Sequence, residues 1–131
     1  MARIRSLAFW VLAAALLAAH LVVAWQSLTV RFWEDEAFNI TVPLNLLHGL
    51  GYTSDGTLSG SMLSPFDPRI STGPAVLLPV AGVLATGIDP VIGARLVPLG
   101  YWMLLLAGLA VLGVRLGGRW AALLATAVPL V

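Results

Sequence analysis

The hydrophobic positions gather into long uncharged runs, and short segments between these runs carry the charges. The first run covers residues 6–30 and follows Arg3 and Arg5. As a helix it would be about 37 Å long, which exceeds the ~30 Å hydrocarbon core of a bilayer. A cleaved signal peptide is the alternative, but its apolar core is usually only ~7–15 residues long. We therefore predict a first transmembrane helix over about residues 6–30.

A second pattern, over residues 35–48, has helical spacing but is too short to cross a bilayer. We expect a helix that lies in the plane of the membrane interface, bent at Pro43 and ended by the glycines at 49 and 51. Its apolar face would hold Ala37, Ile40, Leu44 and Leu47, and its polar face Thr41, Asn45 and His48.

Residues 52–71 have the composition of a loop, and a short apolar run follows them. Ser71 or Thr72 is expected to cap a helix with Pro74 in its first turn. This helix, over about residues 73–87, has ~14 residues where a span needs ~20, and Pro79 interrupts it. We predict a second interfacial helix within an external loop over residues 31–89.

Asp89 and Pro90 form a helix start, with a capping carboxylate and a proline at the first helical position. A second transmembrane helix is expected over about 90–114, then a basic cytoplasmic turn at 115–119. Residues 120–131 are the start of a third helix, shorter than a span. We interpret residues 1–131 as one incomplete transmembrane module, from a larger polytopic protein or a truncated gene product.

The distribution of arginine favours this topology. If residues 70–88 do not span, more arginines lie on the cytoplasmic side than outside, as the positive-inside rule requires. If they do span, the bias is reversed. The N-terminus is therefore predicted to be cytoplasmic and all six acidic residues external. The inner arginines would be Arg3, Arg5, Arg115 and Arg119, and the outer ones Arg31, Arg69 and Arg95.

Composition defines the class. The chain is 60% hydrophobic and 10% charged, against about 25% charged in soluble domains. The net charge of +1 gives no reason to expect nucleic acid as a partner, and the lack of cysteine excludes disulfides and thiol chemistry. Two histidines are too few for a histidine-rich metal site, so no metal ligands are predicted. The expected fold is all-α: a multi-pass membrane protein whose first partner is the lipid bilayer.

The candidate chemistry lies in three consecutive acids, Glu34, Asp35 and Glu36, directly after the first span. Carboxylates against a membrane face are costly and indicate a functional site. The alternative is a charged collar that ends the span, with Arg31 and Asp35 paired at i,i+4. On a helix Asp35 shares a face with Asn39, while its two acidic neighbours point elsewhere, so the three cannot all serve one site.

A set of short motifs in order along the chain resembles the N-terminal module of the C-type membrane glycosyltransferases, which include protein O-mannosyltransferases and lipid A aminoarabinose transferases. The resemblance covers essentially the whole chain, with a weak match at each motif. The motifs are Asp35-Glu36-Ala37, the segments 47–52 and 66–74, Leu78-Pro79, and Arg95-Leu96-Val97-Pro98.

The resemblance implies an enzyme that transfers a sugar from a polyprenyl-phosphate donor at the extracytoplasmic face of the bacterial inner membrane. It implies Asp35 as the catalytic base or a metal-site residue, and Glu36 as the second catalytic candidate, because both match the family's acidic dipeptide. Arg69 and Arg95 are the candidates for binding the donor phosphate, since arginine suits bidentate phosphate contact. For Arg95 the alternative is a side chain that snorkels to the interface, and for Arg69 a solvated loop charge.

Two alternatives stay open: a small non-catalytic membrane subunit, and a fragment of a transporter with a broken segment around residues 74–79 lining its path. The residues specify neither the donor sugar nor the acceptor. They indicate no cofactor, and a requirement for a divalent metal stays open. Activity of residues 1–131 alone is not expected, because the family's second acidic motif follows its third helix.

Overall fold

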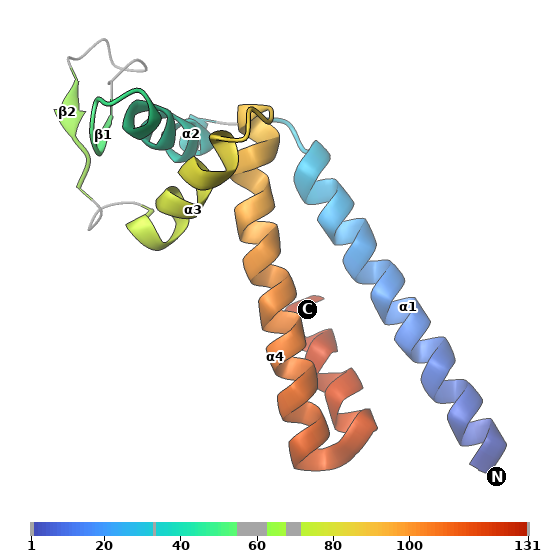
Figure 1. The fold of residues 1–131 in the computed structure, drawn as a ribbon. Helices are drawn as coiled ribbons and strands as arrows, with labels where there is room; N and C mark the ends of the chain where they lie inside the picture. The colour runs from blue at the N-terminus through green and yellow to red at the C-terminus, as the bar shows by residue number, and fades with distance from the viewer. Residues whose placement is uncertain (1, 33, 55–62, 68–71, 131) are drawn as a thin grey trace. The chain divides into compact units, whose positions relative to one another are not determined.

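The computed structural model describes residues 2–32, 34–54, 63–67 and 72–130, without the side chains of residues 2, 3, 34, 35 and 38. Contacts divide the chain into two compact units. Unit 1 contains residues 1–29 and 100–131, and unit 2 contains residues 30–99; each is described by itself. The elements, in order, are helices α1 (Ala2–Thr29) and α2 (Glu34–Leu47), strands β1 (Thr53–Ser54) and β2 (Ser64–Pro65), helices α3 (Pro74–Leu84) and α4 (Pro90–Ala127), and a 3₁₀ turn, Val128–Leu130 (Figure 1).

In unit 1, α1 is a 28-residue helix with apolar side chains on every face. One stripe of less exposed residues recurs every three or four positions, as expected where a helix packs along one side only. Large apolar side chains outside this stripe, such as Leu7, Trp10, Leu21 and Trp25, are more than half exposed. So much exposed apolar surface suits a hydrocarbon environment better than water.

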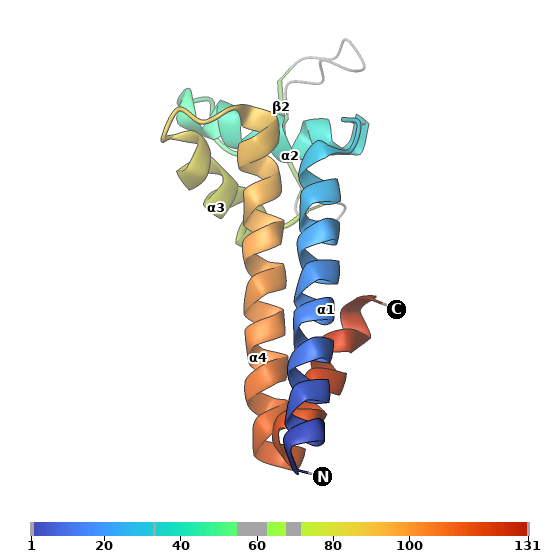
Figure 2. The same cartoon turned by 90° about the vertical axis from the view of Figure 1, so that its right-hand side faces the viewer.

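The rest of unit 1 comes from α4, which contains two helical segments separated at Gly117 and Gly118. Gly118 has φ +74°, a left-handed conformation that glycine adopts without strain. The chain then folds back along itself (Figure 2). A Cβ at Gly113 would lie 2.7 Å from the backbone nitrogen of Ala122. Glycine therefore allows the two segments of α4 to pack backbone to backbone.

In unit 2, α2 and α3 lie side by side and enclose a small apolar core with the first turns of α4 (Figure 1). Val80, Leu84 and Ala94 form its centre. Gly93 brings α4 close to α3, since a Cβ there would lie 2.5 Å from Leu84 Cδ2. The side chains packed around this centre are Ile40, Leu44, Val76, Ile88 and Val97.

Helix α2 begins and ends one residue earlier than predicted, and Pro43 is buried within it. Its C-terminus is a Schellman motif. Gly49 has φ +76°, the Leu50 amide donates to the Asn45 carbonyl at 2.8 Å, and the Gly49 amide donates to Leu46 at 3.2 Å. Glycine at position 49 therefore ends the helix through its left-handed conformation.

The predicted faces of α2 are partly wrong. Leu47, expected on the apolar face, is 42% exposed, whereas Asn45, expected on the polar face, is buried. The Asn45 side chain donates to the Thr53 carbonyl at 3.1 Å, so a tertiary hydrogen bond compensates its burial. Helical periodicity does not reveal such a partner.

Within the predicted loop, β1 and β2 form a two-residue antiparallel ladder that the sequence did not indicate, in which Thr53 pairs with Pro65 and Ser54 with Ser64. The Phe66 amide donates to the Tyr52 carbonyl at 3.0 Å, and the two aromatic rings pack edge to face. These contacts close the loop beside α2. Residues 55–62 and 68–71 lie outside the described part.

Helix α3 begins at Pro74, but its N-cap residue is Gly73, which makes no side-chain capping hydrogen bond. The N-cap residue is therefore not Thr72, and the predicted cap at Ser71 lies outside the described residues. Proline at the first helical position already lacks one of the amides that need a cap. Asp89, by contrast, accepts hydrogen bonds from the amides of Val91 and Ile92, each at 3.0 Å, as its position before Pro90 suggested.

The predominantly helical fold agrees with the sequence analysis. Two helices are long and apolar enough to cross a membrane, α1 and the helical stretch from Pro90 to Leu130, whereas α3 is shorter. The interfacial placement of α2 and α3, and a third span beginning near residue 120, stay predictions.

Candidate functional site around Glu36 and Arg95

A bidentate polar contact in unit 2 joins the first turn of α2 to the second turn of α4. Arg95 Nη2 donates to Glu36 Oε2 at 2.7 Å, and Arg95 Nε donates to Oε1 at 3.1 Å. Each carboxylate oxygen thus accepts from a different guanidinium nitrogen. This bidentate geometry is the strong form of an arginine–carboxylate pair and fixes the orientation of both groups.

Local sequence explains why the guanidinium reaches this place. The Asp89 side chain sets the start of α4, and small residues at 93 and 94 let its first turns approach α3 closely. Arg95 follows these small residues directly, while Glu36 lies in the first turn of α2, which packs against α3 in the same unit. Helix α3 is therefore the common support of both partners.

Burial makes the loss of one partner of this pair more costly than at an ordinary surface contact. The Arg95 side chain is 10% exposed and that of Glu36 is 26% exposed. Exposed pairs contribute about 0–1 kcal/mol, whereas removal of one partner of a buried pair costs about 3–5 kcal/mol. The Glu36–Arg95 pair lies between these cases, because water still reaches part of the carboxylate.

The predicted site residues are located as follows. Glu36 and Arg95 are brought into direct contact. Asp35 lies in the first turn of α2, but its side chain lies outside the described part, and so does the whole of Arg69. Arg95 is paired with Glu36 rather than extended to solvent, and a position of its guanidinium at the membrane interface stays a prediction.

No group of three histidine, aspartate or glutamate residues close enough to hold a metal ion occurs in the described ranges.

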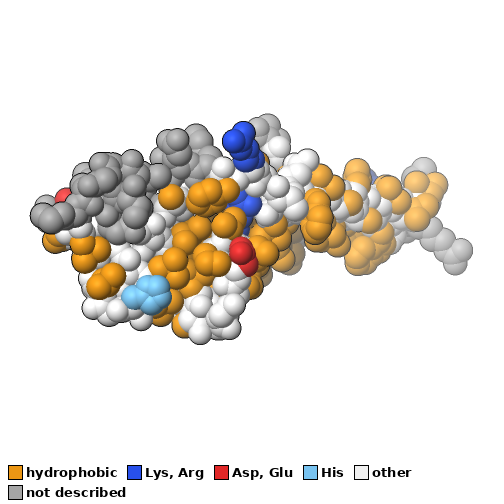
Figure 3. Space-filling model, turned by 90° about the horizontal axis from the view of Figure 1, so that it is seen from above, with side chains coloured by type: hydrophobic (Ala, Val, Ile, Leu, Met, Phe, Trp, Pro, Cys, Tyr) orange, Lys and Arg blue, Asp and Glu red, His pale blue; other side chains and the backbone are white. Residues whose placement is uncertain are grey.

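Tyr52 places a second polar group in unit 2, at the end of the segment between α2 and β1. Burial raises the pKa of its phenol above the usual value near 10, because desolvation disfavours the charged form. Its hydroxyl oxygen is buried without a hydrogen-bond partner among the described residues. Figure 3 shows hydrophobic side chains on one face of the molecule, with few charged groups between them. Leu47, Leu50, Leu63 and Leu78 are among the exposed large apolar residues of unit 2.

Unit 1 contains a polar contact to which the sequence analysis assigned no role. The buried His20 ring approaches the Thr126 carbonyl with its Nε2 at 2.9 Å and packs edge to face against Trp102, with ring centroids 5.9 Å apart. A carbonyl only accepts, so Nε2 carries the proton. Thr126 lies in the last turn of α4, where carbonyls lack donors within the helix. His20 therefore supplies a donor where hydrocarbon offers none. The only sequence signals of this contact were a histidine within one apolar helix and a proline near the end of the second apolar stretch.

Comparisons with protein-family models, with curated proteins and with solved structures gave no match to this chain.

Proposed function

We propose that this chain is the N-terminal membrane module of a glycosyltransferase that moves a sugar from a polyprenyl-phosphate donor to an acceptor on the extracytoplasmic face. The observation that carries the proposal is the Glu36–Arg95 pair. It holds a cation beside the acidic start of α2, in a chain that also has two helices long enough to span a bilayer. The motif resemblance supplies the reaction class.

The proposed chemistry divides the acidic dipeptide into two roles. Asp35 is the base: it takes the proton of the acceptor hydroxyl while that oxygen attacks the anomeric carbon. The bond between the anomeric carbon and the phosphate oxygen breaks, and polyprenyl phosphate leaves with the electron pair. Arg95 stabilises the charge that develops on the phosphate. Glu36 is a positioning residue, because both of its oxygens accept hydrogen bonds from Arg95.

Two exposed apolar surfaces, one in each unit, support the proposal that this protein lies in a membrane. Unit 1 presents apolar side chains on nearly every face of α1, and unit 2 exposes leucines on α2, α3 and the segments beside them. Hydrophobic surface at the membrane suits a donor whose lipid tail stays in the bilayer. A non-catalytic subunit would need a bilayer surface as well, but it would not need an ordered cation beside a carboxylate cluster.

The test is sugar transfer from a labelled polyprenyl-phosphate hexose by the full-length glycosyltransferase that contains this module, measured in membranes and normalised to the amount inserted. A general base contributes about 10²–10⁴ in rate. Asp35→Asn should therefore lower turnover by that factor without lowering donor binding. Glu34→Gln is the matched control, since its azimuth on the helix differs by about 100°. Equal, small effects of both substitutions would contradict the catalytic assignment and favour a charged collar.

Orientation is tested separately. The chain lacks cysteine, so single cysteines introduced at Gly117 and Ser64 can be labelled without further changes. The proposal places position 117 in the cytoplasm and position 64 outside. An impermeant maleimide added to intact cells should label position 64 and should reach position 117 only after permeabilisation. Labelling of both positions from outside would contradict this topology.

A further inference from the structure

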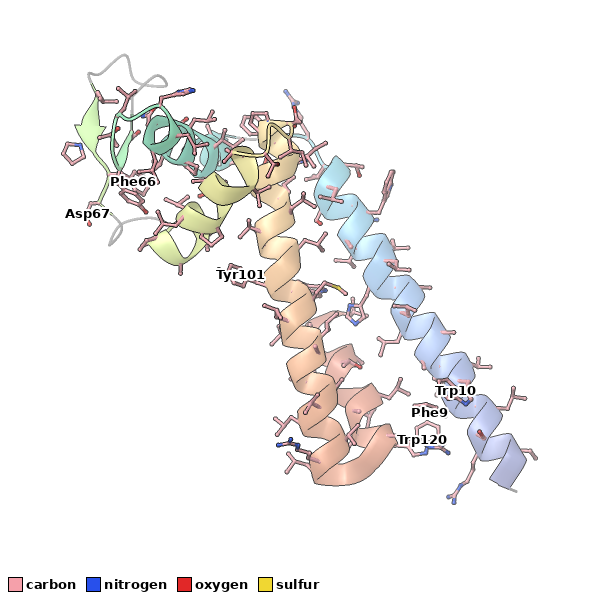
Figure 4. All side chains as sticks on the ribbon, in the orientation of Figure 1. Phe9, Trp10, Phe66, Asp67, Tyr101 and Trp120 are labelled. Atoms are coloured by element: carbon pink, nitrogen blue, oxygen red, sulfur yellow. The ribbon has the colours of Figure 1, made fainter. Side chains whose placement is uncertain are left out.

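One end of unit 1 carries positive charge without any negative charge in the same unit. All six acidic residues of the chain lie between positions 34 and 89, so residues 1–29 and 100–131 contain none. The aromatic contact between Phe9 and Trp120, 5.4 Å between ring centroids, brings the N-terminal part of α1 to the turn in α4 (Figure 4). Arg5, Arg115 and Arg119 therefore belong to the same end.

The arginines at this end differ in their surroundings. The Arg119 guanidinium lies over the Phe9 ring, 4.8 Å from its centroid, and this cation–π contact holds it in place. Arg115 has no acidic partner among the described residues of unit 1. It lies instead at the end of a shallow groove of about 300 Å³ along one face of α4, lined by Ala110, Val111, Val114 and Arg115 itself.

We propose that this groove binds an anionic phospholipid, with the phosphate on Arg115 and an acyl chain along Ala110, Val111 and Val114. An apolar strip that ends in an uncompensated guanidinium is complementary to a lipid in both parts: the strip contacts hydrocarbon, and the cation contacts phosphate. The aromatic cluster of Phe9, Trp10 and Trp120 at the same end is typical of the level of the lipid headgroups. Positive charge on this end favours a lipid with net negative charge over a zwitterionic one.

The experiment measures lipid retained by the protein. The protein is placed in nanodiscs of equal parts phosphatidylglycerol and phosphatidylcholine with matched chains, and retained lipid is counted by native mass spectrometry after transfer to detergent. Phosphatidylglycerol should be enriched. One basic residue at the surface contributes roughly a five-fold preference for an anionic lipid, so Arg115→Gln should lower the enrichment by about that factor, and Arg115→Lys should retain most of it.

Two matched variants separate a lipid site from general attraction. Arg119→Gln removes the same charge on the other side of the break at Gly117 and Gly118, and should change the enrichment much less than Arg115→Gln. Val111→Trp fills the groove without a change in charge and should lower retention as Arg115→Gln does. Inorganic phosphate at millimolar concentration should not displace the lipid. Any one of four results would overturn the proposal: equal losses of enrichment in the two glutamine variants, full lipid retention in Val111→Trp, displacement of the lipid by phosphate, or equal retention of the two lipids.

Discussion

Arg95 and Glu36 are 59 positions apart, yet Arg95 Nη2 and Nε contact both oxygens of the Glu36 carboxylate at 2.7 and 3.1 Å. The pair connects the acidic segment after α1 to the start of α4. A substitution at either residue thus changes the packing of unit 2 as well as any chemistry there. The first prediction separates these two effects.

Glu36→Gln should lower the free energy of unfolding by about 2–3 kcal/mol, because it removes the charged carboxylate that accepts two hydrogen bonds from a largely buried guanidinium. Arg95→Gln should cost a similar amount, and the double variant should cost less than the sum of the two, because the second substitution removes a partner that is already lost. Unfolding in mixed micelles measures all three. Arg31→Gln, at an exposed arginine, is the control and should stay within about 0.5 kcal/mol; additive single effects would argue against a coupled pair.

Both members of this pair are candidates from the sequence, but their contact is not predictable from it. Helix starts and ends follow from local signals: Gly49 ends α2, and Asp89 with Pro90 starts α4. A contact between residues 36 and 95 depends instead on how α3 supports both helices, and no local pattern contains that information. The sequence therefore suggests a catalytic role for Glu36, where the structure shows a carboxylate bound to arginine.

The packing in unit 1 leads to a second prediction, at Gly113. A Cβ there would meet backbone atoms of Ala122, which cannot move aside as a side chain can. Gly113→Ala should therefore destabilise the protein by about 1–3 kcal/mol from overpacking, partly offset by the ~1 kcal/mol that alanine gains over glycine within a helix. Gly108→Ala is the matched control.

Gly108 lies in the same helix, and a Cβ at this position would have nothing within 4 Å. Its replacement by alanine should leave stability unchanged or raise it by up to about 1 kcal/mol. Thermal unfolding in detergent compares the two alanine variants. If Gly113→Ala were as stable as Gly108→Ala, the backbone contact between the two segments of α4 would not exist in the membrane-inserted protein.

The third prediction concerns His20, whose Nε2 donates to the Thr126 carbonyl. Hydrogen bonds between membrane helices contribute about 0.6 kcal/mol on average and up to about 1.7. We expect His20→Phe to cost an amount near the upper value, because the aromatic ring fills the space but leaves the carbonyl without this donor. Gln26→Leu, at an exposed polar position of the same helix, should cost little. Equal stability of both variants in bilayer-mimicking micelles would show that this hydrogen bond does not hold α1.

His20 also shows where sequence reasoning stops. From the sequence it is a polar residue within an apolar run, and packing is its expected explanation. The particular partner follows only from the return of the chain after Gly118, which brings the region near Thr126 beside α1. Residues 20 and 126 are 106 positions apart, so the contact depends on the turn geometry rather than on any spacing in the sequence.

The last prediction is a pH dependence at Tyr52. Desolvation holds the pKa of its phenol above the usual value near 10, and an unfolded chain returns the phenol to that usual value. Because the folded pKa is the higher one, its contribution to stability is complete below pH ~10 and is lost as the pH rises from there through the folded pKa. The chain has two tyrosines, so Tyr101→Phe leaves Tyr52 as the only one to titrate. Its absorbance at 295 nm should change at a higher pH in the folded protein than after unfolding in detergent.

Tyr52→Phe removes a buried hydroxyl that has no partner among the described residues. The variant should therefore leave stability at neutral pH unchanged or slightly higher, and the loss of stability above pH ~10 should become smaller. A titration of Tyr52 at the same pH in the folded and unfolded protein would contradict the burial of this phenol beside Phe66.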